Sequence, residues 1–166
     1  MMSMNDAACQ IKDQALFEEV REMIGFVQAS FQEGRAAHQV EEGLWRRVLQ
    51  LGRSAFGAYL ALFGDGDAGE WVRLEDAREV RRLDALHRRE YQSVFGLFEL
   101  WRAVYGTREG QKIEYVPLDE RLQLPQGKNS YLLQDWDQGL AVEMPYATLN
   151  TTVARILGFT QSVNTL

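Results

Sequence analysis

The side chains of this chain that are best suited to bind a ligand are five arginines close together in sequence. Their acidic neighbours are Glu79, Asp84 and, just beyond, Glu90. Guanidinium groups gathered in this way can contact the phosphates of a nucleic acid, so the stretch is the candidate phosphate-binding loop. The alternative is the solvated face of a β-hairpin. The five residues are Arg78, Arg81, Arg82, Arg88 and Arg89.

No other arrangement of side chains predicts a catalytic or metal site. Asp135 and Asp137 are two residues apart on an expected helix, so they face different directions and make no acid–base pair. Asp65 and Asp67 lack the 12-residue ligand spacing of a calcium loop and fit a solvated turn. Cys9 is the single cysteine, which allows neither an internal disulfide nor a cysteine-based zinc site. We therefore expect no cofactor for this chain.

Composition indicates a folded chain rather than a disordered one. Of 166 residues, 46% are hydrophobic and 11% aromatic. The net charge of -6 argues against coating nucleic acid by charge alone, but residues 1–70 carry 6 basic and 11 acidic side chains, whereas residues 71–166 carry 12 and 13. No apolar run reaches the length of a membrane span, and no signal peptide is evident, so we expect no membrane partner and a cytoplasmic location.

The expected first unit, residues 1–69, is a helical hairpin. Apolar residues recur at three- and four-residue steps over 16–31, and Gly34 would end that helix. The same rhythm over 40–62 predicts a second helix, which the glycine-rich segment 64–70 would end. The apolar and aromatic stripes of both helices are interpreted as core packing.

The expected second unit, residues 70–126, is a small antiparallel β region. "EWVRLED" and "REVRRLD" resemble two short strands across a turn. Residues 91–107 alternate on two faces for longer than an average strand, which predicts one long strand that is either covered on both sides or twisted sharply at Gly96. A further turn at "REGQ" would return the chain into "KIEYV".

The third unit, residues 127–166, is expected to be helical, with Asn129 or Ser130 capping its first helix and Pro145 marking a break. Around Gly158 the spacing of small and apolar residues resembles that of a helix-turn-helix, although a plain helical hairpin fits as well. The second helix would be incomplete. The candidate DNA-contacting side chains of this segment are Arg155, Gln161, Ser162, Asn164 and Thr165.

Several motifs in the second half of the chain resemble those of one group of proteins. From Arg81 to Leu166 the sequence resembles the N-terminal part of the ISKra group of bacterial insertion-sequence transposases. The motifs that carry the resemblance are Phe95-Gly96, Arg102, Tyr105, "YGTREGQKIE", Pro117-Leu118-Asp119, Leu124-Pro125, "SYLLQDWDQ" and "ILGFTQSV".

The resemblance implies a transposase whose catalytic domain uses three acidic residues to hold divalent metal ions. That domain would follow Leu166, so this chain would correspond to a truncated copy or to the first frame of a split gene. We expect an α+β fold and a DNA-binding and assembly region that neither nicks nor joins DNA alone. Its partners would be the element's DNA ends, a second copy or the full-length transposase. The alternative is a protein–protein interaction module or a dimeric inhibitor of that enzyme, and a freestanding hydrolase ranks last.

Overall fold

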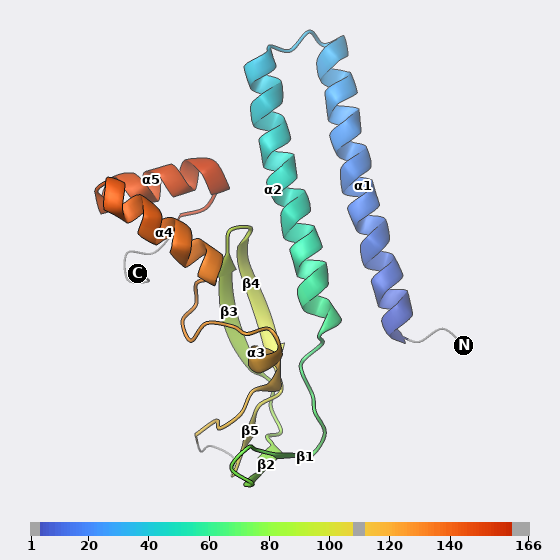
Figure 1. Cartoon of the computed structure of the whole chain (residues 1–166). Helices are drawn as coiled ribbons and strands as arrows, with labels where there is room; N and C mark the ends of the chain where they lie inside the picture. Colours follow the sequence, from blue (N-terminus) through green and yellow to red (C-terminus); the bar gives the residue numbers. More distant parts are fainter. Residues whose placement is uncertain (1–3, 108–111, 161–166) are drawn as a thin grey trace.

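The computed structural model describes residues 4–107 and 112–160 of the chain, and it has the expected α+β fold. A long pair of helices stands beside a smaller body in which two short sheets are followed by three helices (Figure 1). The elements are α1 (Met4–Gln32), α2 (Ala37–Leu62), β1 (Trp71–Arg73), β2 (Glu79–Arg82), β3 (His87–Ser93), β4 (Gly96–Arg102), β5 (Tyr105–Gly106), α3 (Pro117–Arg121), α4 (Tyr131–Glu143) and α5 (Tyr146–Leu157).

The predicted helical hairpin is confirmed, and we call α1 and α2 together the arm. Gly34, with a φ of 65°, ends the first helix in the left-handed conformation that glycine adopts without strain. The helices run antiparallel and approach closely where the ring of Phe26 lies over Gly43. The guanidinium of Arg47 stacks on the same ring at 3.7 Å from its centroid. The arm is therefore held together along one line of each helix.

The strands form two antiparallel sheets. One has the order β1-β2-β5, and the other is the hairpin β3–β4, in which His87 pairs with Arg102 and Ser93 with Gly96. The prediction of one long strand over 91–107 was wrong, because the chain reverses at Val94 and Phe95.

The reversal is stabilised by contacts that a solvent-exposed turn does not have. Gly96 adopts a φ of 107°, which side chains disfavour. The Ser93 hydroxyl accepts a hydrogen bond from the Phe95 amide at 3.0 Å. Arg53 of α2 donates to the carbonyl oxygens of Phe95 and Leu97 at 3.1 and 2.7 Å. The arm thus holds the tip of the β3–β4 hairpin.

The second predicted hairpin is present only in part. Its turn at residues 108–111 lies outside the described residues. The returning segment forms one β-bridge, between Tyr115 and Tyr105, and the Glu114 amide also donates to the Tyr105 carbonyl at 2.9 Å. The expected turn after Pro117 is the short helix α3, in which proline occupies the first position, where no amide donor is needed. Leu118 is buried at 1% exposure and anchors α3 to the body.

The C-terminal helices begin where the sequence predicts. Ser130 caps α4 by accepting a hydrogen bond from the Leu133 amide at 3.1 Å. Pro145 precedes α5, and Gly158, with a φ of 77°, ends it. The second helix of the predicted helix-turn-helix would follow Thr160 and lies outside the described residues.

Two hydrophobic clusters join the arm to the body. The first gathers side chains of α4, α5 and the β3–β4 turn around Leu49 of α2, and the second joins α2 to the sheet and α3. The first includes Val94, Phe95, Leu133, Leu140, Leu149, Val153, Leu157 and Phe159, and the second includes Phe56, Leu60, Tyr91, Phe98, Leu100 and Leu118. The interpretation of the α2 stripe as core packing therefore holds for the side that faces the body.

Candidate nucleic-acid interface

The five clustered arginines of the sequence are each bonded to an acidic side chain. Arg89 is nearly buried, and the others are about half exposed. Most of the acidic partners come from distant parts of the chain, which the local sequence does not reveal. The pairs are Arg78 with Asp76 and Glu114, Arg81 with Glu70, Arg82 with Asp67, Arg88 with Glu90 and Glu99, and Arg89 with Asp119.

Arg89 belongs to a clamp that fixes α3 to the β3–β4 hairpin. One oxygen of Asp119 accepts hydrogen bonds from Arg89 at 2.6 Å and Arg102 at 2.5 Å. Arg89 also donates to the carbonyl oxygens of Pro125 and, at 2.8 Å, Gly127. The arginine side chains are 13% and 12% exposed, so their charge serves the fold rather than a ligand. We call Arg89, Arg102 and Asp119 the arginine clamp.

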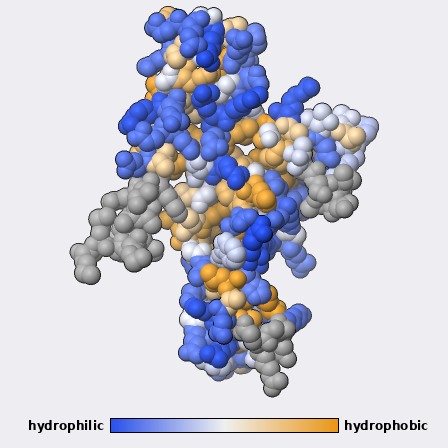
Figure 2. Space-filling view, turned by 180° about the vertical axis from the view of Figure 1, so that it is seen from behind, coloured by the Kyte–Doolittle hydropathy of each residue, from blue (hydrophilic) through white to orange (hydrophobic). Residues whose placement is uncertain are grey.

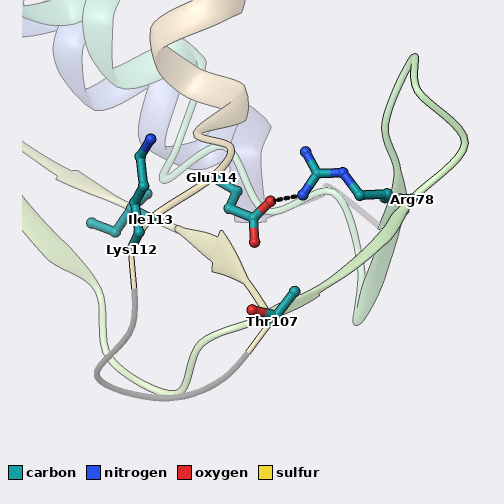
Figure 3. Close-up of a pocket in the computed structure, with 5 residues that line it drawn as sticks. All are labelled: Arg78, Thr107, Lys112, Ile113 and Glu114. Carbon is teal, nitrogen blue, oxygen red and sulfur yellow. Dashed lines mark hydrogen bonds and ion pairs between the residues drawn. The ribbon is translucent and has the colours of Figure 1, made fainter.

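A hollow beside β5 has its arginine paired in a similar way. It has a volume of about 650 Å³ and is lined by Arg78, Thr107, Lys112, Ile113 and Glu114. Figure 3 shows the guanidinium of Arg78 directed at the Glu114 carboxylate, to which it is ion-paired. The guanidinium of Arg78 is thus already paired with a carboxylate of the same hollow.

A groove between the arm and the body has a different charge pattern. It has a volume of about 750 Å³, and its floor includes Phe95 of the β3–β4 turn and Phe159 after α5. Its charged lining residues are Arg46, Arg53, Arg155 and Glu42. The lining is therefore cationic, although the whole chain carries a net charge of -6. We call it the arginine groove.

The three arginines of the groove are held in different ways. Arg53 is fixed by the β3–β4 turn and stacks on Phe98, 4.9 Å from the ring centroid. Arg46 is 75% exposed, and its ion pair with Glu42, one helical turn away, is also exposed and therefore weak. Arg155 is exposed, and it forms no ion pair with any acidic side chain among the described residues. Two guanidinium groups can thus turn toward an anion, while the third adds a fixed charge.

The far wall of the groove is fixed to α2. The indole N–H of Trp45 donates a hydrogen bond to the Ile156 carbonyl at 2.6 Å. Leu157 and Phe159 pack with Leu49 in the first hydrophobic cluster. Seen from behind, the surface is indented between the arm and the lobe that α4 and α5 form (Figure 2). The groove is therefore a preformed feature of the fold.

Of the predicted DNA-contacting side chains that the structure describes, Arg155 alone lines the groove. Gln161, Ser162, Asn164 and Thr165 lie outside the described residues, a few positions beyond Phe159. Our sequence reasoning missed Arg46 and Arg53. Their seven-residue spacing places them on one face of α2, and this was the available signal.

The glycine-rich segment 64–70 is a largely exposed turn, as the sequence predicts, and it is ordered by hydrogen bonds. Asp67 accepts hydrogen bonds from the Gly69 amide at 2.9 Å and from the Tyr105 hydroxyl at 3.1 Å. The bond from Gly69 is the main cause that lowers the pKa of Asp67, and Tyr105 and Arg82 lower it further. Burial raises the pKa of the Tyr105 phenol. Within the described residues, no three acidic, histidine or cysteine side chains are placed to hold a metal ion.

Comparison with known proteins adds no identification. No family model, curated protein or solved structure matches the chain. In the part of the chain that the structure describes, no helix is both long enough and apolar enough to cross a membrane.

Proposed function

We propose that this chain is the DNA-binding and assembly region of a bacterial insertion-sequence transposase, and that the arginine groove is its contact with DNA. One observation carries the proposal. Two motifs of the transposase resemblance, Phe95-Gly96 and the segment 156–159, lie about 60 residues apart in sequence and line the same groove. The side chains that accompany them, Arg46 and Arg155, are cationic and exposed.

Some other motif residues of the resemblance help to position the elements around that groove. Arg102 and Asp119 belong to the arginine clamp, which fixes α3 to the β3–β4 hairpin. Ser130 caps α4, and Leu133 of the same helix lies in the cluster that packs Leu157. These side chains are buried and paired, so their effect on a ligand would be indirect, through the position of the hairpin tip.

The mode of binding follows from the chemistry of the groove. Exposed guanidinium groups bind phosphate oxygens and fix the position of a duplex, but they do not read its sequence. With two exposed arginines, one of them in a weak ion pair with Glu42, on an acidic protein, affinity should be weak and should fall steeply with salt. Any choice of sequence would come from Gln161, Ser162, Asn164 and Thr165, which follow the groove in sequence.

The test compares two sets of arginines by fluorescence anisotropy of a labelled duplex at several salt concentrations. The groove variant carries Arg46→Gln with Arg155→Gln. The matched control carries Arg81→Gln with Arg88→Gln, which removes the same charge from the predicted cluster. Because each lost phosphate contact reduces the salt slope by about 0.9, the groove variant should lose roughly 2 in slope and about tenfold in affinity at low salt.

Two results would contradict the proposal. Equal losses in both variants would mean that only net charge matters, and a loss confined to the control would return the contact to the predicted cluster on β2 and β3. Circular dichroism of each variant establishes that the fold is kept. Sequence preference is examined separately, with duplexes that carry the ends of the element and duplexes of shuffled sequence.

A further inference from the structure

Large apolar side chains line the side of α1 that does not face α2. Side chains on the α2-facing side, such as Met23 and Phe26, are half-buried, and Ser30 is buried. The residues next to them are exposed by 39% to 81%, which is far more than core side chains retain. The exposed set is Phe17 (70%), Val20 (39%), Ile24 (54%), Val27 (43%) and Phe31 (81%).

The spacing of these five residues alternates between three and four positions. That is the a/d repeat of a coiled coil, in which an apolar row stays straight along the helix and fits against another helix. A second row on α2, formed by Val48, Tyr59 and Leu62, is exposed by 47%, 48% and 64%. We call the two rows together the apolar seam.

Both rows lie on the same broad face of the arm. On α1 the row is rotated a little more than a quarter turn from the line that contacts α2, at 100° per residue. On α2 the row is rotated by a similar amount, in the same sense, from the line of Gly43, Arg47 and Ser54, which contact α1. Because the helices are antiparallel, equal rotations in the same sense bring both rows to one side.

The opposite face of the arm is polar. It carries Glu18 and Glu22 on α1 and Glu42 and Arg46 on α2, and the rear view shows mostly hydrophilic side chains on the arm. An acidic helix face does not suit an anionic membrane surface, which attracts lysine and arginine. The arm therefore resembles half of a four-helix bundle, with one face for packing and one for solvent.

The exposed area matches what a stable dimer needs. At roughly 200 Å² for each complete side chain of this size, the apolar seam leaves about 900 Å² uncovered per copy. A typical stable interface buries about 800 Å² on each partner, whereas the largest apolar patch of a monomer rarely exceeds roughly 600 Å².

We propose that the apolar seam is the interface with a second copy of this chain, so that two arms form a two-fold symmetric four-helix bundle. This dimer would be the assembly that the proposed function includes. Its role in transposition rests on the proposed function, whereas the dimer itself does not. Trp45, which is bonded to α5 on the body side of α2, takes no part in the seam.

The experiment is sedimentation velocity of the full chain without DNA, over a range of protein concentrations. The unchanged chain should be a dimer at micromolar concentration. Ile24→Glu places a charge in each half of the seam and should give a monomer. Ala29→Glu introduces the same residue on the solvent side of the same helix and should remain a dimer.

A milder variant tests the same position with less risk that the chain misfolds. Ile24→Ala keeps a good helix former and should weaken the dimer by at least about tenfold, since the side chain is lost twice per interface. A monomeric unchanged chain, or a dimer that survives Ile24→Glu, would overturn the proposal. DNA affinity of the monomeric variant is measured in parallel, so that loss of the dimer and loss of the groove contact are separate results.

Discussion

Replacing Asp119 by alanine is expected to destabilise the fold far more than removal of a comparable surface carboxylate. Asp119 accepts hydrogen bonds from Arg89 and Arg102 at 2.6 and 2.5 Å, and the two arginine side chains are 13% and 12% exposed. Without the carboxylate, two guanidinium groups remain close together with little water and no counter-charge. Arg102 Nε has no hydrogen-bond partner even with Asp119 present. Arg102 therefore has no other hydrogen bond from this atom that could compensate for the loss of Asp119.

The magnitude follows from the burial of the group. Breaking a fully buried ion pair from one side costs about 3–5 kcal/mol. Asp119 is 22% exposed, and Arg89 keeps its bonds to two carbonyl oxygens, so we expect about 2–4 kcal/mol. With a urea dependence of about 1–3 kcal/mol per molar, the unfolding midpoint should fall by about 1–2 M.

The matched control is Glu99→Ala on β4 of the hairpin to which Asp119 binds. Glu99 pairs with Arg88 at 2.5 Å, but both side chains are about half exposed, and such a pair contributes less than about 1 kcal/mol. Equilibrium unfolding in urea, followed by tryptophan fluorescence, measures both variants. If Asp119→Ala and Glu99→Ala shifted the midpoint equally, the arginine clamp would be an ordinary surface contact and the argument from burial would be wrong.

Two further predictions concern backbone and phenol groups near the clamp. Gly66→Ala should cost about 1–3 kcal/mol more than Gly64→Ala, because an added Cβ at Gly66 would lie 2.8 Å from the Leu118 backbone whereas Gly64 faces open space, and both have positive φ. Equal unfolding midpoints would contradict this. The hydrogen bond to Glu120 raises the pKa of Tyr115 to about 12, so folding favours its neutral phenol, and the stability gained is complete below pH 10 and lost as pH rises toward 12. Tyr115→Phe should abolish that part of the alkaline destabilisation and remove one late phenolate absorbance; an unchanged titration would contradict the assignment.

The helices were predictable from the sequence because their signals are local. Periodic apolar residues, Gly34 at the end of α1, Ser130 at the start of α4 and Pro145 before α5 act within a few residues of themselves. The alternation of short strands identified β1 and β2 for the same reason.

The β3–β4 turn was not predictable from local signals because it is not exposed. Turns usually contain polar residues, since water satisfies their backbone groups, but here Val94 is 6% exposed and Phe95 packs in a hydrophobic cluster. Arg53 of α2 replaces water as the donor to the turn carbonyls. A segment whose backbone is satisfied by a distant arginine shows an uninterrupted apolar alternation, which we interpreted as one strand.

The charge surroundings of the predicted arginine cluster could not be predicted from the sequence for a related reason. Arg78, Arg82 and Arg88 look unbalanced in sequence, but the fold brings carboxylates to them from distant positions. Arg46 and Arg155 look unremarkable on separate helices about 110 residues apart, and the fold brings them to one groove. Local charge counts therefore say little about where a folded protein presents net charge.

The arm connects the two proposals through its two faces. Arg46 and Glu42 lie on the polar face, which forms one wall of the arginine groove, while Ile24 and Val48 lie on the opposite face. A dimer formed through the apolar seam would leave both grooves open, and the two-fold axis would relate them. Two weak phosphate contacts joined in one particle bind a DNA carrying two sites far more tightly than either does alone. A duplex long enough to reach both grooves should therefore bind the unchanged chain more tightly than a short one does. The monomeric variant Ile24→Glu should lose this dependence on length. It should keep the affinity for short duplexes, because a short duplex contacts a single groove and a monomer still has one.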